Sequence, residues 1–135
     1  MTKQQLYKLQ KIQNTAARIL TNTNRFSHIS PVIKDLHWLP VEKRIQFKII
    51  IFVFKCLNNM APFYLCNLIQ LYVPSRNLRS VFSNRLRIPK IKGKTGERSF
   101  YHAAPTLWNS LPTELKNCKK YNTFKEKLKT HLFLL

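Results

Sequence analysis

Apolar residues near the N-terminus recur at steps of three and four, a spacing that places side chains on one stripe of a helix. They are Leu6, Leu9, Ile12, Ala16, Ile19 and Leu20. Cationic side chains fall on the other side of the same helix: Lys8, Lys11 and Arg18. The pattern therefore predicts an amphipathic helix over residues 3–22.

A longer helix, over about residues 41–58, is predicted from a stretch that is apolar nearly all round. Cations at steps of four and seven mark one solvent-facing edge: Arg44, Lys48 and Lys55. Helices with this pattern usually lie at the centre of a bundle. The run from Ile49 to Phe54 is also β-prone, so a strand is the alternative here. The length of the stretch and the spacing of its charges favour the helix.

Prolines predict two shorter helices. Ser30 before Pro31 is typical of an N-cap followed by the first helical residue, and predicts a helix that runs to His37. A second helix begins at Pro62 and runs to Leu71.

Two further helices are predicted in the last third of the chain. Residues 100–109 have a helical pattern, and Pro112 opens a short turn after them. Thr123 and Glu126 form a capping-box pattern, in which each side chain accepts a backbone N–H at the start of a helix. It predicts a final helix that carries Phe124, Leu128 and Leu132.

Residues 73–99 combine helix-breaking residues with a high density of positive charge. The breakers are Pro74, Ser75, Asn77, Ser80, Ser83, Asn84, Pro89, Gly93 and Gly96. Arg85-Leu86-Arg87-Ile88 alternates like a short strand, and the proline that follows confines such a strand to a sheet edge. The pattern predicts an extended basic segment, with or without a small hairpin.

Together these elements predict a mainly α fold, a small helical domain with a basic, partly extended (optionally short β) segment near residues 73–99. A length of 135 residues suits a single domain over residues 1–135, helical in 1–72 and in 100–135. The hydrophobic content of 44% argues against a disordered basic tail. Two glycines and seven prolines fit helices punctuated by proline better than a turn-rich β-sandwich.

Charge indicates what kind of partner the chain has. It contains 24 Lys and Arg against five acids, a net charge of +19. Self-repulsion of this size weakens a compact fold, so we expect a polyanionic partner. RNA or DNA is the commonest. An anionic membrane surface is the competitor, but the longest apolar run is far too short to span a bilayer, and no membrane partner is predicted.

Catalytic chemistry is not expected. Metal-assisted nucleotidyl transfer needs clustered carboxylates that hold two divalent ions. The acids are scattered: Asp35, Glu42, Glu97, Glu114 and Glu126. Gly93-Lys94-Thr95 imitates the end of a phosphate-binding loop, but Ile88 stands where the full pattern needs glycine. No nucleophile-elbow or zinc-ligand spacing occurs. We predict no enzyme activity, no metal site and no cofactor.

Cysteines and tryptophans are expected to be structural. Cys56 and Cys66 lie among apolar residues, as small buried thiols do. The lack of a disulfide framework indicates a reducing compartment, so we expect a cytoplasmic and nuclear location. The first 34 residues have no acid and would also suit a mitochondrial transit peptide. Trp38 and Trp108 could stack on bases, but their place beside leucine and proline at helix boundaries favours packing.

Several motifs, taken in order along the chain, resemble one known family. In the first half they are Leu9-Gln10-x-Ile12-Gln13-Asn14-x-Ala16-Ala17-Arg18-Ile19-Leu20, His37-Trp38-Leu39-Pro40-Val41 and Leu57-Asn58-x-x-Ala61-Pro62-x-Tyr64-Leu65. In the second half they are Pro74-Ser75-Arg76-x-Leu78-Arg79-Ser80, Ala103-Ala104-Pro105-x-Leu107-Trp108-Asn109-Ser110-Leu111-Pro112 and Phe124-Lys125-x-x-Leu128-Lys129-Thr130-His131-Leu132-Phe133. The ordered set resembles the C-terminal segment, after the polymerase domain, of LINE-type (non-LTR) retrotransposon reverse transcriptases, the Rex branch among them. Asn59 stands where that family commonly has a glycine.

The resemblance implies that the chain is the last part of a longer protein with an endonuclease and a reverse transcriptase. In such elements these parts together nick target DNA and copy element RNA into it. The segment after the polymerase would help to hold the RNA template and the target DNA. None of the family's catalytic residues carries over, because the paired aspartates of the polymerase palm have no counterpart here. The polymerase domain is therefore a further expected partner.

We predict that the basic segment contacts nucleic-acid phosphates without catalysis. The candidate contact residues are Arg76, Arg79, Arg85, Arg87, Lys90, Lys92, Lys94 and Arg98. Eight cations beside one acid, Glu97, exceed what solubility requires. Two alternatives stay open. The segment could be a solvated linker, or the helices could form a structural module that packs on a polymerase thumb and has no independent activity.

Overall fold

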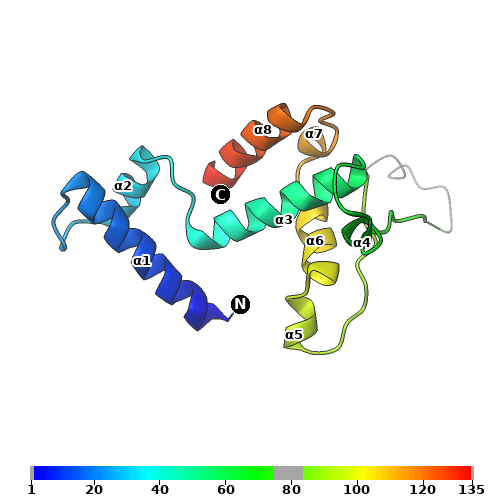
Figure 1. Cartoon of the computed structure of the whole chain (residues 1–135), viewed down its shortest axis with the longest axis horizontal. Helices are drawn as coiled ribbons and strands as arrows, with labels where there is room; N and C mark the ends of the chain where they lie inside the picture. Colours follow the sequence, from blue (N-terminus) through cyan, green and yellow to red (C-terminus); the bar gives the residue numbers. More distant parts are fainter. Residues whose placement is uncertain (1, 75–83, 135) are drawn as a thin grey trace. The chain divides into compact units, whose positions relative to one another are not determined.

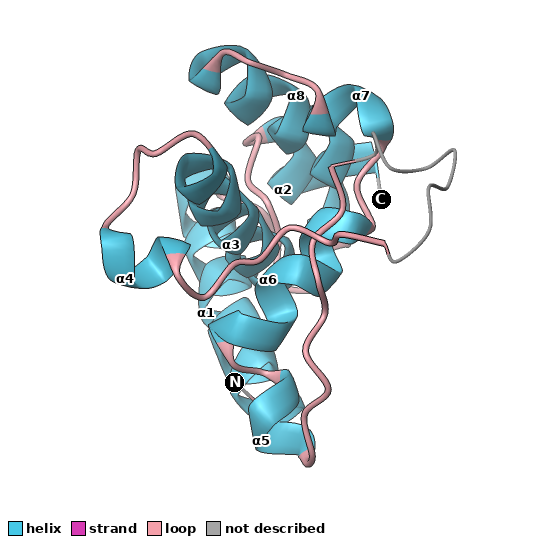
Figure 2. Cartoon of the chain, turned by 90° about the vertical axis from the view of Figure 1, so that its right-hand side faces the viewer, coloured by secondary structure: helices cyan, strands magenta, loops and turns pink. Residues whose placement is uncertain are grey.

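The computed structural model describes residues 2–74 and 84–134, and within them the chain is mainly helical (Figure 1). The helices are α1 Lys3–Thr21, α2 Ile29–Asp35, α3 Val41–Leu57, α4 Phe63–Cys66, α5 Lys94–Glu97, α6 Phe100–Asn109, α7 Thr113–Lys116 and α8 Tyr121–Leu134. Figure 2 shows these helices joined by loops. In the described part of the chain, the β pairing is one antiparallel bridge between Leu71 and Leu86. The predicted fold class is confirmed.

The chain divides into two compact units, residues 1–45 and residues 46–135. The boundary lies inside α3, at a point that the apolar pattern of residues 41–58 does not mark. The first unit contains α1, α2 and the start of α3. The second contains the rest of α3 and the helices from α4 to α8.

In the first unit, side-chain amides join α1 to the chain that enters α3. The side-chain Nε2 of Gln13 donates to the backbone carbonyl of Leu39 at 2.9 Å. The side-chain Oε1 of Gln10 accepts the backbone N–H of Val41 at 2.9 Å. The buried apolar residues of this unit are Ala17, Ile33 and Leu39. Because only three apolar side chains of this unit are buried, these hydrogen bonds contribute a large share of its stability.

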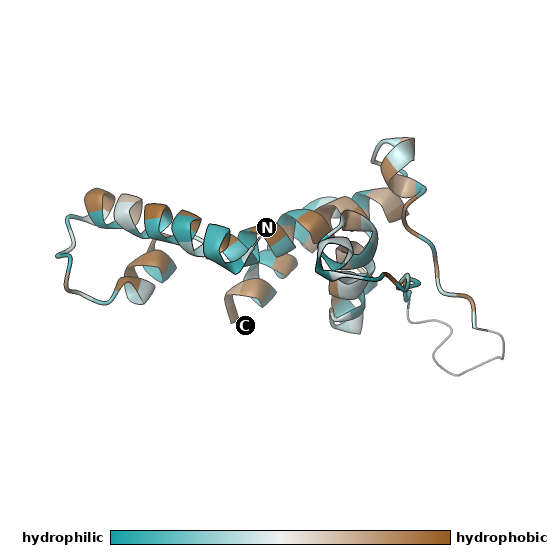
Figure 3. Cartoon of the chain, turned by 90° about the horizontal axis from the view of Figure 1, so that it is seen from below, coloured by the Kyte–Doolittle hydropathy of each residue, from teal (hydrophilic) through white to brown (hydrophobic). Residues whose placement is uncertain are grey.

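Helix α1 matches its prediction closely and begins at a capping box. The Thr2 hydroxyl accepts the N–H of Gln5, and the Gln5 side chain accepts the N–H of Thr2. Its apolar stripe is only partly covered. Exposed fractions are 65% for Ile12, 75% for Ile19 and 66% for Leu20. Figure 3 shows the more hydrophobic part of α1 toward the end of the helix away from the N-terminus.

The core of the second unit is built around three aromatic rings from three helices. Phe54 of α3 and Phe124 of α8 are stacked with ring centroids 4.2 Å apart, and Trp108 of α6 lies 5.9 Å from Phe124. Each of the three side chains is 1% exposed or less. The predicted stripe of α8 is confirmed, since Phe124, Leu128 and Leu132 are buried. The predicted exposed edge of α3 is confirmed at Arg44 and Lys48, whereas Lys55 is half-buried.

Besides the end of α2, which lies at Asp35 rather than at His37, three predicted helix boundaries are wrong. Helix α2 begins after His28, so that Ser30 and Pro31 lie within its first turn. Proline is tolerated there because backbone N–H groups of the first turn have no partner inside the helix. Helix α8 begins at Tyr121, which places Thr123 inside the helix and removes it as an N-cap.

The third boundary is the end of α4, which stops at Cys66 rather than at Leu71. The chain beyond it is drawn into the bridge with Leu86, a tertiary contact that local sequence does not reveal. Before α4, Asn59 has a φ of 56°. This left-handed conformation favours glycine and is tolerated by asparagine, which fits a helix end at this position.

The predicted extended segment is confirmed for residues 84–93, which contain no helix. It ends sooner than expected, because Lys94–Glu97 forms the short helix α5. Gly93 precedes α5 with a φ of 92°, a conformation that L side chains rarely adopt. A Cβ atom on Gly96 would clash with Cγ2 of Ile91. The two glycines that were expected to break helices therefore permit a turn and a close approach.

Candidate nucleic-acid interface

The C-terminal end of α6 holds the basic segment in place. The side-chain oxygen Oδ1 of Asn109 accepts the backbone N–H of Leu86 at 2.9 Å. The side-chain Nδ2 of Asn109 donates to the backbone carbonyl of Leu86 at 2.8 Å. The indole N–H of Trp108 donates to the carbonyl of Asn84 at 2.9 Å. Two neighbouring side chains thus fix the backbone of residues 84–86 through three hydrogen bonds.

The same residues pair with the chain that follows α4. The N–H of Tyr72 donates to the carbonyl of Arg85 at 2.9 Å, and the N–H of Arg87 donates to the carbonyl of Gln70 at 2.8 Å. These two bonds flank the Leu71–Leu86 bridge, so the described part of this region forms one short antiparallel pair. The alternation that predicted a strand at 85–88 is therefore real, although it extends over a single bridge.

Alternation along this pair separates the buried residues from the charged ones. Successive side chains of an extended chain point to opposite faces. Leu86 is 2% exposed, whereas Arg85 and Arg87 on either side of it are exposed. Tyr72 stands opposite Arg85 in the pairing and is 51% exposed. Two guanidinium groups and one aromatic ring therefore belong to the outer face of a segment whose backbone is fixed.

The predicted contact residues fall into three groups. Arg85 and Arg87 are brought together by the fold as just described. Lys90, Lys92, Lys94 and Arg98 are exposed along the extended chain and around α5, with Glu97 among them. Arg76 and Arg79 lie outside the described residues.

Lys116 is a site residue that sequence reasoning missed. It lies at the end of the short helix α7 and is only 9% exposed, and its ammonium donates to the carbonyl of Asn109 at 2.9 Å. Burial lowers the pKa of Lys116 below its ordinary value of 10.5, and the charge of Arg85 lowers it further. A buried ammonium beside an arginine makes this part of the second unit strongly electropositive. No periodic pattern marks this residue, since α7 is one turn long.

Two further predictions about single residues have clear outcomes. Packing of Trp108 is confirmed by its burial, and Trp38 is half-buried. Cys56 is buried as predicted, whereas Cys66 and Cys118 are half-buried. Burial, with the neighbouring Cys66 thiol as a further cause, raises the pKa of Cys56 from 9.0 to about 12. This thiol is therefore poorly reactive at neutral pH, because the thiolate is the nucleophile.

Across residues 2–74 and 84–134, no three or more His, Cys, Asp and Glu side chains gather as they would around a metal ion. Within the same ranges, no helix has the combination of length and hydropathy needed to cross a membrane.

Comparisons with known proteins add no relative. No protein-family model, curated protein or solved structure matches the chain.

Proposed function

We propose that this chain is a non-catalytic nucleic-acid-binding module, derived from the C-terminal region of a LINE-type reverse transcriptase, that contacts RNA template or target DNA through phosphates. The observation that carries the proposal is the outer face of Arg85 and Arg87, held by the Asn109 bonds to Leu86. A fixed backbone reduces the entropy lost when these side chains bind a phosphate chain. The retrotransposon origin rests on the ordered motifs of the sequence.

Charge supports nucleic acid as the partner. Among the residues from 84 to 98, six cations accompany one acid, and all six are exposed. Arginine suits phosphate particularly well, because its planar guanidinium can donate two parallel hydrogen bonds to the oxygens. Contacts of this kind position a strand without reading its sequence. We therefore expect affinity that depends strongly on salt and weakly on base sequence.

The test measures how binding of a labelled single strand and a labelled duplex depends on salt, by fluorescence anisotropy. Each phosphate contact contributes about −0.7 to the log–log salt slope on single strands and about −0.9 on duplex DNA. The double variant Arg85→Gln/Arg87→Gln should flatten the slope by about 1.4 and about 1.8, respectively, because two contacts are lost.

The matched control is Lys3→Gln/Lys8→Gln, which removes the same charge from exposed positions of α1. The salt slope of this control variant should change less than that of the arginine double variant. Equal changes in both double variants would show that diffuse charge does the binding. An unchanged slope in the arginine variant would remove this face from the interface.

A second function, packing on a polymerase domain, is favoured by one observation. The apolar residues Ile12, Ile19 and Leu20 of α1 and Phe63 of α4 are exposed. Exposed apolar residues on this scale are typical of surfaces that another protein covers. A purified chain that self-associates at physiological salt and binds no nucleic acid would favour this function over the first.

A further inference from the structure

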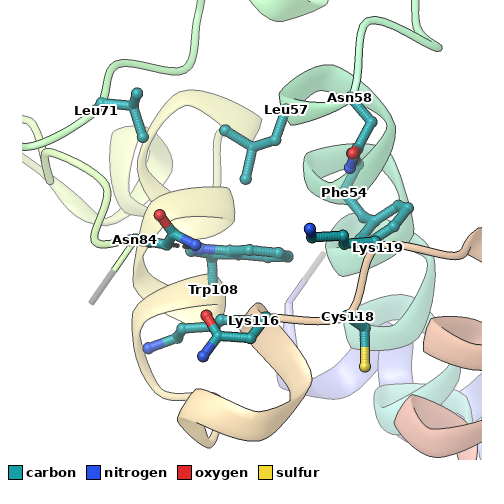
Figure 4. A pocket seen from close by; sticks show the side chains of 10 residues that line it. Phe54, Leu57, Asn58, Leu71, Asn84, Trp108, Lys116, Cys118 and Lys119 are labelled. Atoms are coloured by element: carbon teal, nitrogen blue, oxygen red, sulfur yellow. Dashed lines mark hydrogen bonds between the residues drawn. The ribbon is translucent and has the colours of Figure 1, made fainter. Parts of the chain in front are cut away.

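The second unit contains a pocket of about 420 Å³ beside Trp108 (Figure 4). This volume falls within the range of roughly 300–1,000 Å³ that is usual for small-ligand sites. Leu57 from the end of α3 and Leu71 supply apolar walls above the indole of Trp108. The pocket can therefore take a group with an apolar body.

The polar lining of this pocket has one sign of charge. Lys116 and Lys119 line it, and none of the described residues that line it is a carboxylate. Figure 4 shows the ammonium of Lys119 pointing toward the space between the labelled side chains. A buried cation without a carboxylate beside it is costly unless an anion compensates it. The ligand that fits is therefore anionic at one end.

Amide groups complete the lining. Asn58, Asn84 and Asn117 surround the pocket, and each amide offers both a donor and an acceptor. The Asn58 amide already donates to the carbonyl of Phe54 at 2.8 Å, so its oxygen remains to accept. Paired donors and acceptors are what the edge of a nucleobase requires.

We propose that this pocket receives one unstacked nucleotide of a bound single strand. Its base lies against Leu57 and Leu71 with its edge toward the asparagine amides, and its phosphate lies at the ammonium of Lys119. Arg85 of the outer basic face lies near the pocket, since its charge lowers the pKa of Lys116, which lines the pocket. This inference rests on the proposed function, and it adds that unpaired strands are preferred over duplexes.

The first test compares two neighbouring lysines. Lys119 lines the pocket, and Lys120 is also exposed but does not line it. Lys119→Gln should weaken single-strand binding several-fold more than Lys120→Gln, whereas duplex binding and inorganic polyphosphate binding should weaken equally in both variants. Equal losses on the single strand would overturn the pocket as a nucleotide site.

The second test reports on occupancy directly. The chain has two tryptophans, so Trp38→Phe leaves Trp108 as the only indole fluorophore. An intact single strand should change the emission of Trp108 and bind about tenfold more tightly than the same strand with abasic positions, since base contacts with such sites contribute on this scale. Salt-dependent binding with an unchanged Trp108 emission and no abasic effect would overturn the inference and leave the proposed function standing. No binding of any strand at low salt would overturn both.

Discussion

Residues 1–45 and residues 46–135 are stabilised by different kinds of interaction. The first unit buries three hydrophobic side chains among the described residues. The side-chain amides of Gln10 and Gln13 bond to the backbone of Val41 and Leu39, where the chain enters α3. The second buries thirteen, centred on the ring cluster of Phe54, Trp108 and Phe124. A hydrogen bond contributes about 0.5–1.5 kcal/mol net, and a fully buried large side chain about 1.5–3 kcal/mol. The comparison places most of the folding stability in the second unit.

The largest effect is expected from truncating the ring cluster. Phe124→Ala should lower the free energy of unfolding by about 3–5 kcal/mol, because it removes a stacked ring at 0% exposure and leaves a cavity. Ile33→Ala in the first unit should lower it by about 2 kcal/mol, since that core is small and can relax. Urea denaturation followed by circular dichroism measures both. An equal or larger loss from Ile33→Ala would reverse the comparison.

The next effect concerns the anchor of the basic segment. Asn109→Ala should lower the free energy of unfolding by about 1–3 kcal/mol, because it leaves the N–H and the carbonyl of Leu86 without their partner. Hydrogen exchange should show loss of protection at the Leu86 amide. Asn122→Ala, at an exposed position of α8, is the control and should stay within about 0.5 kcal/mol of the parent. Unchanged protection at Leu86 would show that Asn109 does not hold the segment.

A smaller effect is expected from the amide network of the first unit. Gln13→Ala removes the buried hydrogen bond to the Leu39 carbonyl and should lower the free energy of unfolding by about 1–2 kcal/mol. Gln4→Ala, exposed on the same helix, should have almost no effect. If the two variants have the same stability, the first unit does not depend on its side-chain amides.

The smallest effect is a pH dependence in the second unit. The pKa of folded Lys116 lies below 10.5, so between the two values the unfolded chain binds more protons than the folded one. The free energy of unfolding should therefore rise with pH through this window and level off near pH 10.5. Cys56 opposes this above pH 9.0, because its pKa is raised. Subtracting the pH profile of Lys116→Met, which keeps Cys56, isolates the lysine. A zero difference in slope would contradict the burial of its charge.

Long periodic elements were predictable from the sequence, and contacts between distant segments were not. The spacing of apolar residues predicted α1 and the buried face of α8, and the length and charge spacing of residues 41–58 predicted α3, because a long helix repeats its pattern over several turns. The short helices α4 and α5 each have four residues, fewer than the spacing argument needs. Propensity also misplaced two helix starts, because the favourable capping residues Ser30 and Thr123 lie one and two residues after the first residues of α2 and α8, Ile29 and Tyr121.

The candidate interface was predictable in its charges but not in its geometry. Composition located the exposed cations of residues 85–98, since a run of arginine and lysine is visible along the chain. The anchor by Trp108 and Asn109 spans more than twenty positions and depends on a side chain pairing with backbone, which leaves no periodic trace. The contact of Lys116 with the backbone carbonyl of Asn109 likewise depends on how the chain turns between α6 and α7. Both became visible only once the helices were placed within the unit.

The anchor at the end of α6 bonds to main-chain atoms alone. Trp108 and Asn109 contact the carbonyl and N–H groups of residues 84 and 86, and none of these bonds depends on which side chains stand at positions 85 and 87. Mutation can therefore replace the two arginines with acidic, aromatic or small residues without loosening the segment that presents them. The backbone of the segment is held independently of the side chains that contact the ligand. Substitutions at positions 85 and 87 can therefore change the ligand during evolution without changing the fold.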